Sequence, residues 1–97
     1  MVTHIVLWKI NAELSTKERT TAGDTIKSNL EGLNGKIDGL ISMEVIIDKL
    51  ESSTHDIALI SKFDSLDALN GYQKHPAHLE VVGYIRSVTY EAASFDY

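Results

Sequence analysis

The fold of this chain is decided by its central stretch, Gly39–Phe63, which reads GLISMEVIIDKLESSTHDIALISKF. Apolar and polar residues alternate through Leu40–Leu50, as in a strand with one buried face. The polar run Glu51–Thr54 has the composition of a hairpin loop, and Asp56–Phe63 again carries apolar residues at alternate positions. The stretch therefore predicts two antiparallel strands that are neighbours in one sheet.

On the N-terminal side of this hairpin, the sequence predicts a strand followed by a helix. Val2–Ile10 is rich in β-branched residues and contains no breaker. Ser15 is a suitable helix N-cap, and Glu18 can complete a capping box with it. Asn34-Gly35 is expected to end this helix. Its apolar positions follow steps of four, four and three residues: Ala22, Ile26, Leu30 and Leu33.

On the C-terminal side, the sequence predicts a broken helix and a last strand. Asp64-Ser65 provides the helix cap, and Pro76 breaks the helix and can occupy the first turn of a second piece. The expected buried stripes are Leu66, Leu69 and Tyr72 in the first piece and Leu79, Val82 and Ile85 in the second. Val88–Tyr97 returns to strand character. The complete pattern is βαββαβ, a ferredoxin-like α+β fold with a four-stranded antiparallel sheet, in a single domain over residues 1–97.

The composition excludes several classes of function. The chain has no cysteine, so disulfides, thiolate nucleophiles and cysteine metal sites are impossible. Its net charge is −5 and its basic residues are spread singly, which disfavours nucleic acids and membrane surfaces as partners. No signal peptide or membrane span is recognisable. Without a signal peptide, a membrane span or cysteine, we expect a complete cytoplasmic protein. No Gly-rich phosphate loop or Gly-x-Ser-x-Gly elbow occurs, and we expect the protein to use no cofactor.

The predicted sheet has more apolar surface than two helical layers on one side can cover. The first and third strands carry apolar residues on both faces: Val6 and Ile5 in the first, Leu59 and Ile60 in the third. An exposed apolar sheet face of this size is a liability in a monomer. We therefore expect a homodimer with the sheets packed face to face. The alternative is that the helices are larger, or the strands shorter, than the pattern indicates.

Three segments carry a resemblance to a known family: His4–Lys9 (HIVLWK), Tyr72–His78 (YQKHPAH) and Phe95–Tyr97 (FDY). Over essentially its whole length the chain resembles the stress-responsive A/B barrel domain family, the dimeric α+β barrels. The resemblance implies a homodimer whose two sheets form a barrel. Members of the family include plant proteins linked to stress tolerance, some with a loop magnesium ion, and at least one polyketide cyclase. The ligands of such a magnesium ion cannot be mapped onto this sequence.

The resemblance to the cyclase also implies site residues. In that enzyme a Tyr and a His of the Tyr72–His78 segment, and a His on the first strand, line the active site, and the matching positions are Tyr72, His78 and His4. They imply a general base, His78, assisted by Tyr72 and by His4, which shares a strand face with Val6. The first turn of a helix favours a neutral imidazole at His78. Alternatively, all three are structural: the histidines as hydrogen-bonded groups and Tyr72 as a core residue.

The predicted function is therefore the binding of a small hydrophobic carbonyl ligand in a pocket between sheet and helices. Cofactor-independent proton transfer of a cyclase or isomerase type would fit this pocket. The alternatives are a non-catalytic, stress-related structural dimer and, ranked lower, the oxygenase-like chemistry of related dimeric α+β barrels. The spacing of His75 and His78 could suggest a metal, but Pro76 interrupts the geometry and no third ligand is evident, so we expect no metal site.

Overall fold

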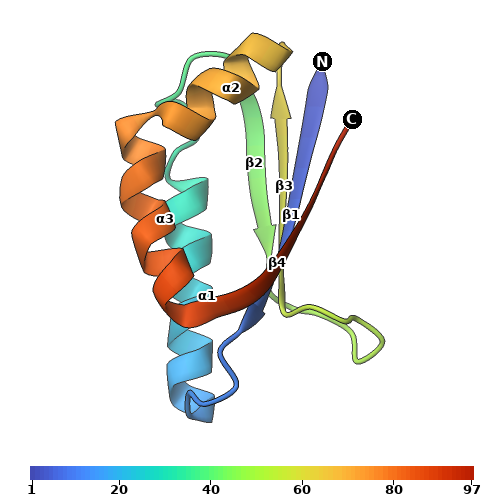
Figure 1. The fold of residues 1–97 in the computed structure, drawn as a ribbon, viewed down its shortest axis with the longest axis vertical. Coiled ribbons are helices and arrows are strands. Elements are labelled where there is room, and N and C mark those ends of the chain that lie inside the picture. Colours follow the sequence, from blue (N-terminus) through green and yellow to red (C-terminus); the bar gives the residue numbers. More distant parts are fainter.

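The computed structural model describes residues 1–97 as two layers, a four-stranded sheet with three helices on one of its faces (Figure 1). In chain order the elements are β1 (Val2–Ile10), α1 (Thr16–Glu31), β2 (Leu40–Ile46), β3 (Ile57–Phe63), α2 (Leu66–Lys74), α3 (Pro76–Val88) and β4 (Thr89–Asp96). All neighbouring strands are antiparallel, in the order β2-β3-β1-β4. This is the predicted ferredoxin-like βαββαβ fold, with α2 and α3 as the two pieces of its second helix. No helix is both long enough and apolar enough to cross a bilayer.

The helix starts follow the predicted capping chemistry. The Ser15 hydroxyl accepts a hydrogen bond from the Glu18 amide at 3.1 Å, and the Glu18 carboxylate accepts one from the Ser15 amide at 2.9 Å. The Ser65 hydroxyl caps α2 by accepting a hydrogen bond from the Ala68 amide at 3.1 Å, without a reciprocal bond. The end of α1 was predicted too late, because Gly32 already caps the helix at Glu31. The next amides bond carbonyls three residues back instead of four, so the chain continues as turns.

Two of the predicted stripe positions were wrong. Leu66 and Leu79 are 60% and 56% exposed, whereas Ile85 is buried. Steps of three residues rotate around a helix by about 60° each, so Leu79 and Ile85 lie about 120° apart. Val81, four residues before Ile85, takes the inner position instead. Two strands are also shorter than predicted: β2 stops at Ile46 rather than Leu50, and β4 spans Thr89–Asp96 rather than Val88–Tyr97.

The core lies between the helices and the inner face of the sheet, where fifteen buried apolar residues form one cluster. The strand register decides which side chains reach it. Val6 of β1 is paired with Leu59 of β3, which is paired with Val45 of β2, and all three side chains pack in the core layer. Neighbours in sequence therefore point to the opposite face, as the two-residue period of a strand requires.

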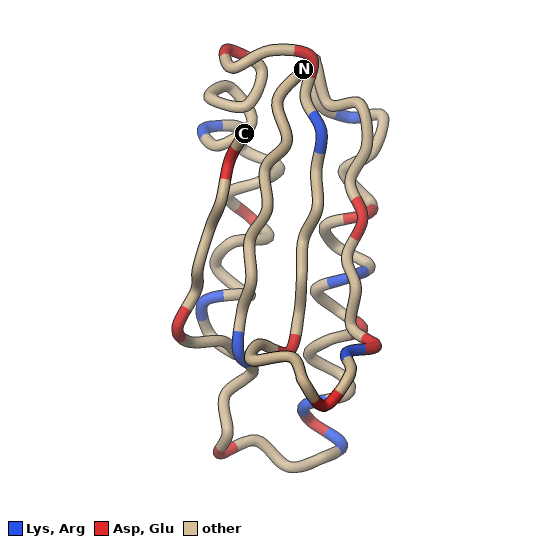
Figure 2. Tube along the Cα trace, turned by 90° about the vertical axis from the view of Figure 1, so that its right-hand side faces the viewer, with Lys and Arg blue, Asp and Glu red and all other residues tan.

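The opposite face of the sheet, which we call the open face, is covered by no helix (Figure 1). Ile5 is paired with Ile60 on one side and with Phe95 on the other, and Phe95 is 66% exposed. Further along the same face, Leu7 is paired with Ala58. Figure 2 looks onto this face, and the charged residues lie mainly near the strand ends and in the loops. The centre of the open face is thus apolar, as the sequence predicted.

Gly39 allows close contact between the start of β2 and the start of α2. Its φ is +82°, and its carbonyl accepts a hydrogen bond from the Asp64 amide at 2.9 Å. A Cβ atom at this position would overlap the Cβ of Ala68 and lie 2.9 Å from Oδ1 of Asp64. The positive φ and the close approach each favour glycine.

We predict opposite effects for two glycine-to-alanine substitutions, measured as the free energy of unfolding in urea. Gly39→Ala is expected to destabilise the fold by about 2 kcal/mol or more, from the positive φ together with the overlap. Gly71→Ala is the matched control, since it lies within α2 and a Cβ there meets nothing within 4 Å. It should stabilise the helix by about 0.5–1 kcal/mol. Equal effects of the two substitutions would contradict this account of Gly39.

Candidate functional site

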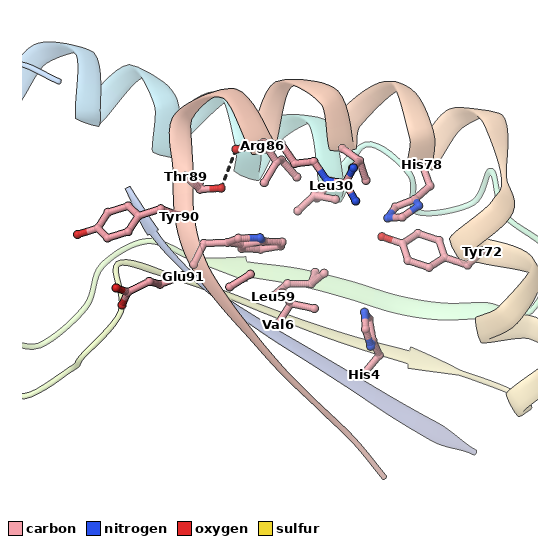
Figure 3. Close-up of a pocket in the computed structure, with 14 residues that line it drawn as sticks. His4, Val6, Leu30, Leu59, Tyr72, His78, Arg86, Thr89, Tyr90 and Glu91 are labelled. Carbon is pink, nitrogen blue, oxygen red and sulfur yellow. Dashed lines mark hydrogen bonds between the residues drawn. The ribbon is translucent and has the colours of Figure 1, made fainter. Parts of the chain in front are cut away.

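A cavity of about 370 Å³ lies between α3 and the inner face of the sheet (Figure 3). Val6 and Trp8 of β1 form part of its sheet side, and Val82 and Ile85 of α3 line its helix side. Its size is within the usual range for small-molecule sites, which are mostly apolar with a few placed polar groups. The polar groups include the three residues singled out from the sequence: His4, Tyr72 and His78 all line this cavity.

The break between α2 and α3 brings Tyr72 and His78 together. His75 is extended (φ −68°, ψ 134°), and its Nδ1 accepts a hydrogen bond from the Ala77 amide at 3.1 Å, so it caps α3. Pro76 is the first residue of that helix, where its missing amide hydrogen costs nothing. His75 thus has a local structural role at the start of α3. The rings of Tyr72 and His78 consequently face each other, with centroids 4.2 Å apart.

Tyr72 presents a buried hydroxyl without a hydrogen-bond partner. The residue is 1% exposed and its ring packs against Phe63 at 5.1 Å, so the expectation of a core position is met. Its hydroxyl, however, bonds to nothing in the protein, and Figure 3 shows it pointing toward the cavity beside His78. Burial raises the pKa of this hydroxyl above its usual value, so it keeps its proton. The structure thus holds a free hydrogen-bond donor at the cavity wall.

His78 is half-buried and its tautomer is set by the backbone. Its Nδ1 lies 3.3 Å from the Gln73 carbonyl, which can only accept, so Nδ1 carries the hydrogen and Nε2 a lone pair. Burial is the main reason that the pKa of His78 is lowered, and the charges of His4, Arg86 and His75 lower it further, against the opposing effect of the Gln73 bond. The imidazole is therefore neutral at physiological pH, with a lone pair available to accept a proton.

His4 is held by the last strand. It is 7% exposed, and its Nδ1 lies 2.5 Å from Oδ1 of Asp96, the residue paired with it in β4. Because the carboxylate accepts this hydrogen bond, the second ring nitrogen is the one that points into the cavity in Figure 3. The ring lies edge-on to Tyr72 with centroids 6.5 Å apart. No hydrogen bond links the three predicted residues directly.

Two polar residues of this site were not identified from the sequence. Asp96 could have been found by pairing the last strand with the first, which brings it opposite His4. Arg86 lines the cavity from α3 and follows His78 by two steps of four residues, a spacing that keeps both on one helix face. No group of three or more His, Asp or Glu side chains is arranged to hold a metal ion.

Comparison with protein families identifies one that matches nearly the whole chain. A family model described as the Stress Responsive A/B Barrel Domain matches residues 2–97. A dimeric protein of unknown function with a ferredoxin-like fold from Bacteroides fragilis is 31% identical, with 99% of this chain and 93% of that chain covered and a TM-score of 0.91. No curated protein matches the chain in sequence.

Two more distant structures share the fold. A dimeric ferredoxin-like protein of unknown function from Thermobifida fusca is 21% identical, covers 99% of this chain and 88% of that one, and has a TM-score of 0.82. A hydroxynitrile lyase from Passiflora edulis is 19% identical, with 99% and 90% covered and a TM-score of 0.79. At these identities the likeness concerns the fold alone.

We predict that Tyr72→Phe leaves the free energy of unfolding unchanged or raises it, by up to about 1–3 kcal/mol, because the substitution removes a buried donor that has no partner. Thermal and urea unfolding would measure this. Tyr84→Phe, in the partly buried Tyr84 of α3, is the matched control and should change stability little. Clear destabilisation by Tyr72→Phe would mean that the hydroxyl has a structural partner in the folded protein.

Proposed function

The chain belongs to the stress responsive A/B barrel domain family, and on that premise we propose that it binds a small hydrophobic carbonyl compound in the cavity and transfers a proton on it without a cofactor. The observation that carries the proposal is the unpartnered Tyr72 hydroxyl. Leaving a buried donor unsatisfied is unfavourable for folding. A ligand carbonyl that accepts its hydrogen bond would remove that penalty.

In the proposed mechanism His78 is the general base. Its Nε2 lone pair takes a proton from the carbon next to the ligand carbonyl, and the electron pair left on carbon moves onto the carbonyl oxygen. Tyr72 donates a hydrogen bond to this enolate oxygen, and His4 supplies a second polar contact from the sheet side. If the carbon that lost its proton is next to a C=C bond, return of the proton from His78 at the far carbon of that double bond is an isomerisation. Attack of the enolate carbon on a second carbonyl of the same molecule is a cyclisation, in which the alkoxide that forms takes the proton back from His78.

The electrostatics of the site support these roles. A base whose pKa is lowered stays neutral at physiological pH, and a hydroxyl whose pKa is raised stays a donor. General bases of this kind contribute about 10²–10⁴-fold to rates, and a donor aimed at a developing oxyanion about 10²–10³-fold.

We predict that the protein catalyses hydrogen–deuterium exchange at the carbon next to the carbonyl of aryl ketones such as propiophenone, followed by NMR in heavy water. His78→Ala should lower the exchange rate by about 10²–10⁴-fold. His75→Asn is the matched histidine control, because asparagine can still cap α3, and it should keep nearly the full rate. Equal exchange by wild type and His78→Ala would remove His78 from the mechanism.

The pH profile of this exchange should have a definite sign. The rate depends on neutral His78, so it should be constant above the ordinary histidine pKa of about 6.5. It should fall only as the pH drops through the lower pKa that His78 has in the folded protein. If the exchange rate already falls while the pH is lowered toward 7 from above, His78 is not the neutral base proposed here. Binding of the ketones without any exchange would instead favour the non-catalytic alternative.

We also propose that the protein is a homodimer in which two open faces pack together. Ile5, Ile60 and Phe95 form a continuous apolar patch in register across three strands, and no part of the chain covers it. The relatives from Bacteroides fragilis and Thermobifida fusca are described as dimeric, which supports the same assembly here. Two-fold pairing would join the two sheets into the barrel that the family name describes.

We predict that sedimentation equilibrium at micromolar concentration gives about twice the chain mass of 10.8 kDa. Ile60→Asp should shift the protein to the monomer, because it buries a charge in the centre of the proposed interface. Leu79→Asp is the matched control: Leu79 is an exposed leucine on α3, away from the open face, and this variant should remain dimeric. A wild-type protein that sediments at the single-chain mass would refute the dimer.

A cytoplasmic location is part of this proposal and rests on sequence grounds. A chain without cysteine needs no oxidising compartment for its stability. Fractionation of cells that express a tagged version would test the location directly.

A further inference from the structure

We infer that Arg86 binds a carboxylate of the ligand, so that the cavity prefers a small hydrophobic keto acid to a neutral ketone. This inference rests on the proposed function and specifies its substrate class. It is carried by three features: the position of Arg86 over the cavity, its lack of any partner within the protein, and the free polar group beside it.

The position follows from the geometry of α3. His78, Val82 and Arg86 follow one another at steps of four residues, and all three line the cavity. Side chains on a helix lean toward its N-terminus, which tilts the long Arg86 side chain toward the turn that carries His78. Figure 3 shows the guanidinium reaching along the cavity toward His78. A carboxylate bound there would lie next to the proposed base.

Arg86 has no protein partner, in contrast to the chain's other arginine. Arg19 pairs with Asp56 at 3.5 Å and donates to the carbonyls of Ile10 and Asn11 at 3.1 Å. Arg86 makes no ion pair and no hydrogen bond, although the chain has 14 acidic residues and only nine Lys and Arg. Its planar group of donors is therefore free to take a carboxylate in two parallel hydrogen bonds.

The third feature is the buried Tyr72 hydroxyl, which is also without a partner; Tyr72 lines the same cavity. A keto acid would satisfy both groups at once, with its carboxylate on Arg86 and its carbonyl on Tyr72. The apolar remainder of the molecule would lie against Val6 and Trp8.

The charge around the cavity favours a single carboxylate over a phosphate. The nearby acidic residues are already paired, Asp96 with His4 and Glu91 with Lys9 at 2.6 Å. Arg86 is thus the only permanent positive charge that lines the cavity without a partner. One guanidinium balances one carboxylate, whereas a doubly charged phosphate would keep an uncompensated charge next to apolar walls.

The test measures binding of matched acid and amide probes by NMR titration at neutral pH. The probes are phenylacetate, hydrocinnamate and phenylbutyrate, each paired with its primary amide, which has the same shape and no charge. The proteins are the wild type, Arg86→Met, Arg86→Lys and Lys17→Met. Lys17 lies on α1, does not line this cavity and has no ion-pair partner, so Lys17→Met is a charge-matched control.

For the best-fitting pair we expect wild type and Lys17→Met to prefer the acid over the amide by about tenfold or more, the size of one charge-assisted contact. Arg86→Met should abolish the preference while its affinity for the amide stays the same. Arg86→Lys should retain part of it, since lysine keeps the charge but loses the planar fork. A merely structural role of Arg86 would weaken acid and amide equally.

Two results would overturn the inference, and only the second would also overturn the proposed function. The first result is that amides bind but the wild type shows no preference for the acids, or that Arg86→Met keeps the preference. In either case the carboxylate site at Arg86 is wrong, and the proposed carbonyl pocket stands. If no probe of either kind binds, the cavity is not a ligand site, and the proposed function is lost together with the inference.

Discussion

The candidate site depends on one constraint, the break between α2 and α3 at Pro76. Proline lacks an amide hydrogen and keeps the residue before it out of the helical conformation, so His75 is extended and α2 cannot continue. In one uninterrupted helix, Tyr72 and His78 would be about 9 Å apart along the axis and about 120° apart around it. The break instead lets their rings meet at 4.2 Å, and it points α3 along the cavity so that Arg86 follows on the same side.

The polar groups of this site differ from the polar groups that hold the fold. Asp56 illustrates the second kind: it accepts hydrogen bonds from Lys49 and from the Ile10 amide and pairs with Arg19. Burial alone would raise the pKa of Asp56, but these partners outweigh it and the pKa is lowered. The buried hydroxyl of Tyr72 and the guanidinium of Arg86, an exposed residue, by contrast have no partner in the protein. Within one small chain, the structural polar groups around Asp56 are satisfied, whereas two of the polar groups at the cavity are left available.

Much of the fold and part of the site could be predicted from the sequence. The alternation in Leu40–Ile46 and Ile57–Phe63 and the capping box at Ser15 are local signals, and the structure follows them. Burial along α2 and α3 was predicted less well, as Leu79 illustrates, because the side that a helix buries depends on how it packs against the sheet. His4, Tyr72 and His78 were found by resemblance. Arg86 was missed, because a lone arginine in a helix has no local signal that separates a cavity wall from a solvated face.

The sequence by itself determined the order of strands and helices, the break at Pro76 and the excess of apolar residues on both faces of the sheet. These follow from periodicity, capping and proline stereochemistry, which act over a few residues. Only the tertiary structure decided that residues 4, 72 and 78 line one cavity, that Asp96 orients His4, and that Arg86 and the Tyr72 hydroxyl are left without partners. Those outcomes depend on strand register and helix placement, which join residues up to 92 positions apart and which no local pattern encodes.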